Sequence, residues 1–214
     1  MGRGGTIRRP SMARLLICAL CFVLLALPEV SGQVSSAHAL TDEDLSLARL
    51  AVALSSKERA GWSAEAAVLL DSTRPMCDGS STHLCLNVGV LDDLTLPATI
   101  ALMTPDCARL DYRALRNSFV ARNTRSLPLG PLSMGLPIVP GSEVRALSAE
   151  AKFDRFGGRW LVEVSAPAYS PDGRSALVYV QAYPASDGFW ASIRVFERRD
   201  GQWAPTRCGL NLTP

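Results

Sequence analysis

The sequence predicts an α+β fold, a single domain in which an antiparallel β-meander sheet packs against helices. Two observations lead to this fold class. Four β-rich runs follow one another after residue 159 with only short turns between them, which favours antiparallel neighbours in one sheet. The part of the chain before them has two segments with helical periodicity, and helices set apart from a run of strands indicate the α+β class.

The composition is that of a globular chain. The 214 residues are 48% hydrophobic and 20% charged, which suits one sizeable core and excludes an intrinsically disordered chain. No apolar run reaches the roughly 18 residues that a transmembrane helix needs. The expected organisation is a signal peptide over residues 1–32, a flexible leader over residues 33–40 and a single domain over residues 41–214, with the meander at residues 159–208.

The first 32 residues have the pattern of a secretory signal peptide. An apolar run covers residues 15–27, Pro28 ends it, and four arginines precede it: Arg3, Arg8, Arg9 and Arg14. This pattern predicts cleavage after Gly32, with an uncleaved signal anchor as the alternative. The chain that remains carries about one net negative charge and lacks the basic stripe of a nucleic-acid binder.

Cysteine usage agrees with export. Cys18 and Cys21 lie in the apolar run and leave with it, so that four cysteines remain: Cys77, Cys85, Cys107 and Cys208. An even number in an exported chain predicts two disulfides, with three connectivities open. The simplest choice closes the turn-rich loop between Cys77 and Cys85 and pairs Cys107 with Cys208. Abundant Arg and Ala with only two lysines suggest a bacterial, GC-rich source, and therefore the periplasm or the exterior as the destination.

A helix is expected over residues 42–56. Thr41 and Asp44 have the spacing of a capping box, and the apolar side chains that follow form one helical stripe: Leu47, Leu50, Ala51 and Leu54. Residues 67–70 are a short apolar run between chain-breaking residues, which favours a buried strand over a helix.

The middle of the chain is less regular. Residues 84–91 are apolar and expected to be extended. Asp106 is expected to cap a helix over residues 108–122. Residues 127–141 hold four prolines and three glycines, which predicts a rigid, irregular connector.

The meander is expected to contain strands over residues 160–166, 175–183, 189–197 and 202–207. Turn sequences lie between them: Pro171-Asp172-Gly173, Asp187-Gly188 and Asp200-Gly201. Gly supplies the positive φ that tight turns need, and Asp bonds to its own backbone.

One face of the meander is a candidate binding face. Side chains alternate along a strand, and we expect the aromatic faces of the second and third strands to align. Five side chains would then lie together: Tyr179, Tyr183, Trp190, Arg194 and Phe196. Such a patch suits a sugar, a peptide or a partner protein. The alternative is that these residues are the larger core, covered by the N-terminal elements.

Four segments occur in an order that resembles a group of uncharacterised exported bacterial proteins: residues 71–73, 119–123, 169–180 and 200–203. The pattern of that group is an aromatic residue, a turn, an Ala-Leu-Val-Tyr-Val strand and a closing Asp-Gly-x-Trp hairpin. The resemblance covers roughly residues 66–207 and implies no catalytic residue, because the group carries no known activity. The motif at residues 170–174 also resembles one blade of TolB-like propellers, but it occurs once and a propeller needs several blades.

No catalytic, cofactor or metal site is expected. Cys77, His83 and Cys85 are close in sequence, but His38 is the only other histidine and a zinc site needs about four N or S ligands. The sequence therefore predicts an exported, non-catalytic binding or structural domain, with a protein or glycan partner in the periplasm or outside the cell. The alternative is a hydrolase with a carboxylate-based site. Asp92 and Asp93 would be one carboxylate pair, although adjacent strand residues point to opposite faces.

Overall fold

The computed structural model describes residues 39–58, 66–75, 105–130, 136–184 and 190–212. Within them, the helical elements are α2 (Asp42–Glu58), η1 (Cys107–Arg109), α5 (Tyr112–Arg122), α6 (Gly141–Ala146) and α7 (Ala149–Phe156). The strands are β1 (Ala67–Leu70), β2 (Ile138–Val139), β3 (Trp160–Val164), β4 (Ala168–Tyr169), β5 (Ser175–Pro184), β6 (Trp190–Arg199), β7 (Gln202–Pro205) and β8 (Leu210–Leu212). The α+β fold is confirmed.

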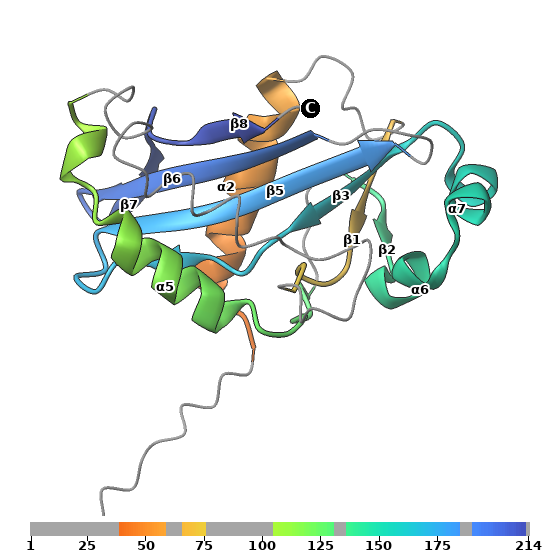
Figure 1. Ribbon diagram of the computed structural model, residues 1–214, viewed down its shortest axis with the longest axis horizontal. Coiled ribbons are helices and arrows are strands. Elements are labelled where there is room, and N and C mark those ends of the chain that lie inside the picture. The colour runs from red at the N-terminus through yellow and green to blue at the C-terminus, as the bar shows by residue number, and fades with distance from the viewer. Residues whose placement is uncertain (1–38, 59–65, 76–104, 131–135, 185–189, 213–214) are drawn as a thin grey trace, which may run out of the picture. The chain divides into compact units, whose positions relative to one another are not determined.

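The described strands form one sheet with helices on both faces. In Figure 1, α2 passes behind β5 and β6 and α5 lies in front of them. The core agrees, because apolar residues of α2 pack on one face of β5 while those of α5 pack on the other face. Apolar residues of α6 and α7 pack on that second face, over β1 and β3. The layers are therefore α2, the sheet, and a layer of α5, α6 and α7.

The sheet is only in part a meander. Its order is β2-β1-β3-β5-β6-β7, with β4 also on β5 and β8 also on β6. The run β3-β5-β6-β7 is antiparallel as predicted, but β1 is parallel to both β2 and β3. The sheet is therefore mixed. Parallel partners need a long crossover connection, and the chain between β1 and β3 supplies it with α5, α6 and α7.

Local signals explain most element boundaries. The capping box of α2 is confirmed, because the Asp44 carboxylate accepts from Thr41 N at 2.9 Å and Asp44 N donates to Thr41 Oγ1 at 3.1 Å. The predicted strand at 67–70 is also confirmed as β1. Gly173 has φ +66°, as the predicted turn before β5 requires. The turn predicted at 187–188 lies outside the described residues.

The helix predicted from residue 108 begins later. Leu110 is extended after the single turn of η1, and Asp106, at the N-cap of η1, forms no capping hydrogen bond through its side chain. Asp111 is the cap of α5, and its carboxylate accepts from Ala114 N at 2.9 Å. The connector predicted over 127–141 is also interrupted, because β2 and the start of α6 lie within it.

One predicted disulfide is present. Cys107 and Cys208 are bonded across a sequence separation of 101 residues. Both cysteines are buried in the core beneath α5. Cys77 and Cys85, the other predicted pair, lie outside the described residues, as do residues 84–91 and the pair Asp92 and Asp93.

Candidate functional site

The five residues of the candidate binding face do not lie on one face. Trp190 pairs with Ala182, Arg194 with Val178 and Phe196 with Ala176, so these three side chains share the small aliphatic face of β5. Tyr179 and Tyr183 point to the opposite face. Side chains alternate within each strand as predicted. The predicted register between β5 and β6 is wrong, and a shift of one residue in register is enough to exchange the faces.

The face that holds Trp190 and Phe196 is core. Trp190 is 4% exposed and Phe196 is fully buried, both in the cluster that includes the apolar stripe of α2. The Arg194 guanidinium donates two hydrogen bonds, of 2.7 and 2.6 Å, to the carboxylate of Glu58 at the end of α2. These hydrogen bonds lower the pKa of Glu58. The alternative reading, a core covered by an N-terminal element, therefore holds for these three residues.

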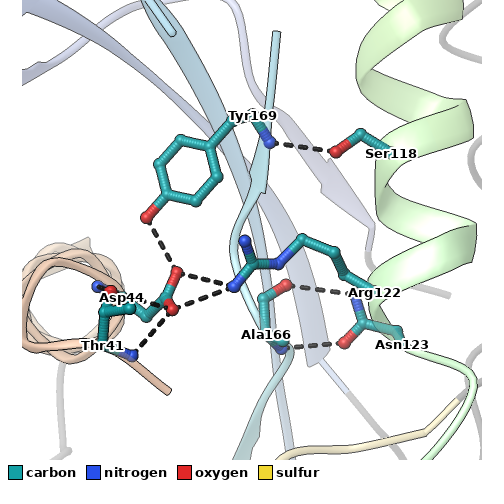
Figure 2. Close-up of polar contacts among 7 residues, drawn as sticks. All are labelled: Thr41, Asp44, Ser118, Arg122, Asn123, Ala166 and Tyr169. Atoms are coloured by element: carbon teal, nitrogen blue, oxygen red, sulfur yellow. Dashed lines mark hydrogen bonds and ion pairs between the residues drawn. The ribbon is translucent and has the colours of Figure 1, made fainter. Parts of the chain in front are cut away.

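A buried carboxylate fixes the other end of α2. Figure 2 shows Asp44 between α2, Arg122 of α5 and Tyr169 of β4. Arg122 Nη2 lies 2.9 Å from each Asp44 oxygen, and the Tyr169 hydroxyl donates to Oδ1 at 2.8 Å. Asp44 is 1% exposed. Burial, and then the hydrogen bond to this carboxylate, raise the pKa of Tyr169.

The Asp44 site is structural in its geometry. Its carboxylate is fully engaged, and Figure 2 also shows Asn123 bonded to both backbone groups of Ala166 beside it. Beyond Tyr169, Trp203 lies 5.8 Å away between ring centroids, and its indole nitrogen donates to Glu43 at 2.7 Å. These contacts join the first turn of α2 to α5, β4 and β7, and they leave no oxygen of Asp44 free to meet a substrate.

A second charged group lies on the opposite face of the sheet. We call it the arginine cluster; its members are Arg74, Arg145, Lys152, Glu163 and Tyr183. Glu163 of β3 is fully buried, and its two oxygens form ion pairs with Arg74 and, at 2.8 Å, with Arg145. A carboxylate in a buried strand needs such partners, because an unpaired charge there would be strongly unfavourable.

Hydroxyl groups and a close backbone approach complete the arginine cluster. Arg145 Nη2 donates to Ser72 Oγ at 2.6 Å and to Ser126 Oγ at 3.2 Å. The N–H of Gly141 donates to the Asp71 carboxylate at 2.8 Å. A Cβ at position 141 would lie 2.6 Å from Ser72 Oγ and 2.9 Å from Arg145 Nη2, so any larger residue there would displace these two side chains.

Tyr183 has a buried hydroxyl without a bond. The residue is 8% exposed, and its oxygen has no hydrogen-bond partner within the described residues. Burial raises its pKa, and the charge of Glu163 adds to the effect. By contrast, the hydroxyl of Tyr179, with a pKa raised by burial to about 12, donates to Gln181 at 2.9 Å. The fold therefore gives a hydrogen-bond partner to the hydroxyl of Tyr179 and none, among the described residues, to that of Tyr183.

Lys152 reaches the same place from α7. Its ammonium nitrogen lies 5.8 Å from the centroid of the Tyr183 ring. Burial lowers the pKa of Lys152, Glu163 opposes that effect and Arg74 adds to it. Three cationic side chains thus gather around the single carboxylate of Glu163.

The arginine cluster lies where a mixed sheet offers a binding position. The residues that follow β1 and β2, namely Asp71, Ser72, Arg74 and Gly141, come together with Glu163 near the carboxyl end of β3. Ligands of open sheets bind at the carboxyl ends of parallel strands. This cluster was not predicted from the sequence, although one signal was available: Glu163 interrupts the apolar run Leu161-Val162-Glu163-Val164.

A shallow hollow of about 310 Å³ lies beside the disulfide, lined by Asp106, Glu197, Arg199, Pro205, Thr206, Arg207 and Cys208. Two of its charged groups, Arg199 and Glu197, pair with each other at 3.1 Å. Among the described residues, no buried polar atom without a hydrogen-bond partner belongs to its lining, so it is a weaker candidate than the arginine cluster.

No group of three or more His, Cys, Asp or Glu side chains suited to a metal occurs in the part of the chain that the structure describes. None of the described helices is both long and apolar enough to cross a membrane. No protein-family model, curated protein or solved structure matches this chain.

Proposed function

We propose that this protein is an exported, non-catalytic binding domain and that the arginine cluster is its binding site. The observation that supports the site is the Tyr183 hydroxyl, which is buried beside charged groups and bonds to none of the described residues. A buried polar group without a partner is unfavourable by about 1–3 kcal/mol, and a ligand that accepts its hydrogen bond removes that cost.

Export is supported by two independent features. The first 32 residues have the signal-peptide pattern, and the Cys107–Cys208 disulfide suits an oxidising compartment. The periplasm or the exterior is therefore the proposed destination, and the resemblance to uncharacterised exported proteins stays a prediction.

A binding role is favoured over the hydrolase alternative by the state of the buried carboxylates. A general acid or base must reach the proton that it transfers. Asp44 is enclosed by Arg122, Tyr169 and Thr41, and Glu163 is held by two guanidinium groups. Both carboxylates serve the fold, whereas the unused donor at the sheet face belongs to Tyr183.

The two lysines make a direct test practical. The chain contains Lys57, at the exposed end of α2, and Lys152, in the arginine cluster. Carbon-13 methylation of lysine gives one NMR signal for each, without loss of charge. We expect small molecules that raise the melting temperature in a chemically diverse panel to shift the Lys152 signal and leave the Lys57 signal in place.

The hydrolase alternative is tested on the same protein. Chromogenic esters, glycosides and peptides should be recovered intact after prolonged incubation. Turnover that is lost in Glu163→Gln but kept in Glu197→Gln would overturn the non-catalytic assignment. Ligands that shift both lysine signals alike, or neither, would overturn the binding site.

A further inference from the structure

We propose that the arginine cluster recognises an oxyanion, the carboxylate or phosphate group of a small ligand, through the Tyr183 hydroxyl and the Lys152 ammonium. This inference rests on the proposed function, because it names the chemical class of ligand for the same site. It is carried by the charge balance of the cluster and by the placement of its two donors.

The charge balance favours an anion. Arg74 and Arg145 form ion pairs with the Glu163 carboxylate. Lys152 is a third cation, close enough for the charge of Glu163 to act on its pKa. Asp71 lies at the same edge of the sheet, but its Oδ1 atom is bonded to the backbone of Gly141. Like charges brought together away from water raise one another's energy. An added anion would relieve this repulsion, a neutral ligand would not, and a cation would increase it.

The two donors are ready for an acceptor. Within the described residues, no carboxylate forms an ion pair with Lys152 and no atom accepts from the Tyr183 hydroxyl. The ammonium lies over the Tyr183 ring, so both donors belong to one small region. Lys and Tyr donors are suited to oxyanion oxygens, since hydrogen bonds to a charged acceptor are about twice as strong as neutral ones.

The position also suits a ligand more than a structural ion pair. Glu163 already satisfies the fold's need to hold Arg74 and Arg145, which join the segment after β1 and helix α6 to β3. Lys152 and Tyr183 add nothing to that connection. Lys152 comes from α7 and Tyr183 from β5, and neither forms an ion pair or hydrogen bond with Glu163.

The test uses two probes and a matched pair of variants. Inorganic phosphate and succinate are titrated into the full protein by calorimetry at constant ionic strength, with glycerol as the neutral control. Tyr183→Phe removes the hydroxyl that has no hydrogen-bond partner among the described residues. Tyr112→Phe removes a hydroxyl of comparable burial, which donates to the Cys208 carbonyl at 3.2 Å, far along the chain from the cluster.

We expect at least one of the two anions to bind, and the stronger one identifies phosphate or carboxylate as the recognised group. Tyr183→Phe should weaken that binding about tenfold, as expected for a lost hydrogen bond to a charged group. It should raise the melting temperature of the ligand-free protein, because the variant no longer buries a hydroxyl without a hydrogen-bond partner. Tyr112→Phe should keep the affinity and lower the melting temperature. Bound anion should also raise the pKa of Lys152, because a nearby negative charge stabilises the ammonium.

The outcomes separate the two proposals. Binding of neither anion, or equal binding by Tyr183→Phe, overturns the oxyanion assignment. If a neutral ligand from the panel binds and loses affinity in Tyr183→Phe, the anion assignment fails and the binding function stands. If every ligand is indifferent to Tyr183→Phe and leaves the Lys152 signal in place, both proposals fail.

Discussion

Replacing Asp44 with Asn should weaken the attachment of α2 by a predictable amount. Asp44 is 1% exposed and accepts hydrogen bonds from Arg122, Tyr169 and Thr41. Asn has nearly the same volume, so the change removes charge without making a cavity. Its amide group also presents two hydrogens where Arg122 or Tyr169 must donate, so at least one of those bonds is lost.

The size of the loss in free energy of unfolding follows from how deeply Asp44 and Arg122, the two partners of the ion pair, are buried. Breaking a fully buried pair costs about 3–5 kcal/mol. The Arg122 side chain is 35% exposed, and water can therefore compensate it in part. We expect the free energy of unfolding to fall by about 2–3 kcal/mol, since Asn keeps one acceptor for the Thr41 backbone. For a domain of this size the melting temperature should fall by roughly 5–10 °C.

Urea denaturation followed by tryptophan fluorescence measures this loss. Asp42→Asn is the matched control, because Asp42 lies in the same first turn of α2 but is exposed; it should cost less than about 1 kcal/mol through the helix dipole. The double variant of Asp44→Asn with Tyr169→Phe should be less destabilised than the sum of the single variants, because the two share one bond. Equal losses for Asp42→Asn and Asp44→Asn, or strict additivity, would refute the role given to Asp44.

Three further predictions concern the turn, the disulfide and the tyrosines. Gly173→Val should lower the free energy of unfolding by about 1 kcal/mol or more, because φ is +66° at this residue. Gly158→Val is the control and should leave the melting temperature nearly unchanged, because Gly158 lies outside that φ range and has open space around it. Reduction of the Cys107–Cys208 bond should lower the free energy of unfolding by about 4–5 kcal/mol in the chain-entropy model for a loop of 101 residues; an unchanged urea midpoint in reductant would contradict this. Burial raises the pKa of all four tyrosines of the chain, Tyr112, Tyr169, Tyr179 and Tyr183. Absorbance at 295 nm should therefore show no tyrosinate in the native protein at pH 10. The free energy of unfolding should fall as the pH rises from about 10, where the tyrosines of the unfolded chain ionise, toward 12.

Local signals were enough to predict elements whose own residues determine them. The start of α2 follows from the Thr41 and Asp44 capping box, and β5, β6 and β7 follow from alternating apolar residues between glycine turns. These elements need no knowledge of distant partners. The disulfide between Cys107 and Cys208 was also the simplest of three pairings.

Features that depend on partners far along the chain were not predictable in the same way. The alternation within β5 and β6 is regular, but the pairing register between the two strands decides which faces align, and a shift of one residue exchanges them. The helix start was assigned to Asp106, but Leu110 is extended and separates η1 from α5, whose cap is Asp111. The parallel pairing of β1 has no local signature at all.

The candidate site shows the same division. Trp190 and Phe196 were assigned to a binding face because they are aromatic, but aromatic side chains are also common in protein cores. Glu163 was the more informative residue. A carboxylate within a buried strand must have partners, and its partners Arg74 and Arg145 lie 89 and 18 residues away along the chain.

The attachment of α2 has a consequence for the order in which the molecule can be built. The helix is synthesised before every strand that it covers, and its polar contacts reach Tyr169, Arg194 and Trp203 at separations of 125, 136 and 160 residues. Until β5 and β6 exist, the apolar stripe of α2 lacks a large part of the sheet against which it packs. The nascent chain must therefore carry an exposed amphipathic segment through most of its synthesis. Closure of the domain then awaits its final strands, as expected of a fold dominated by contacts distant in sequence.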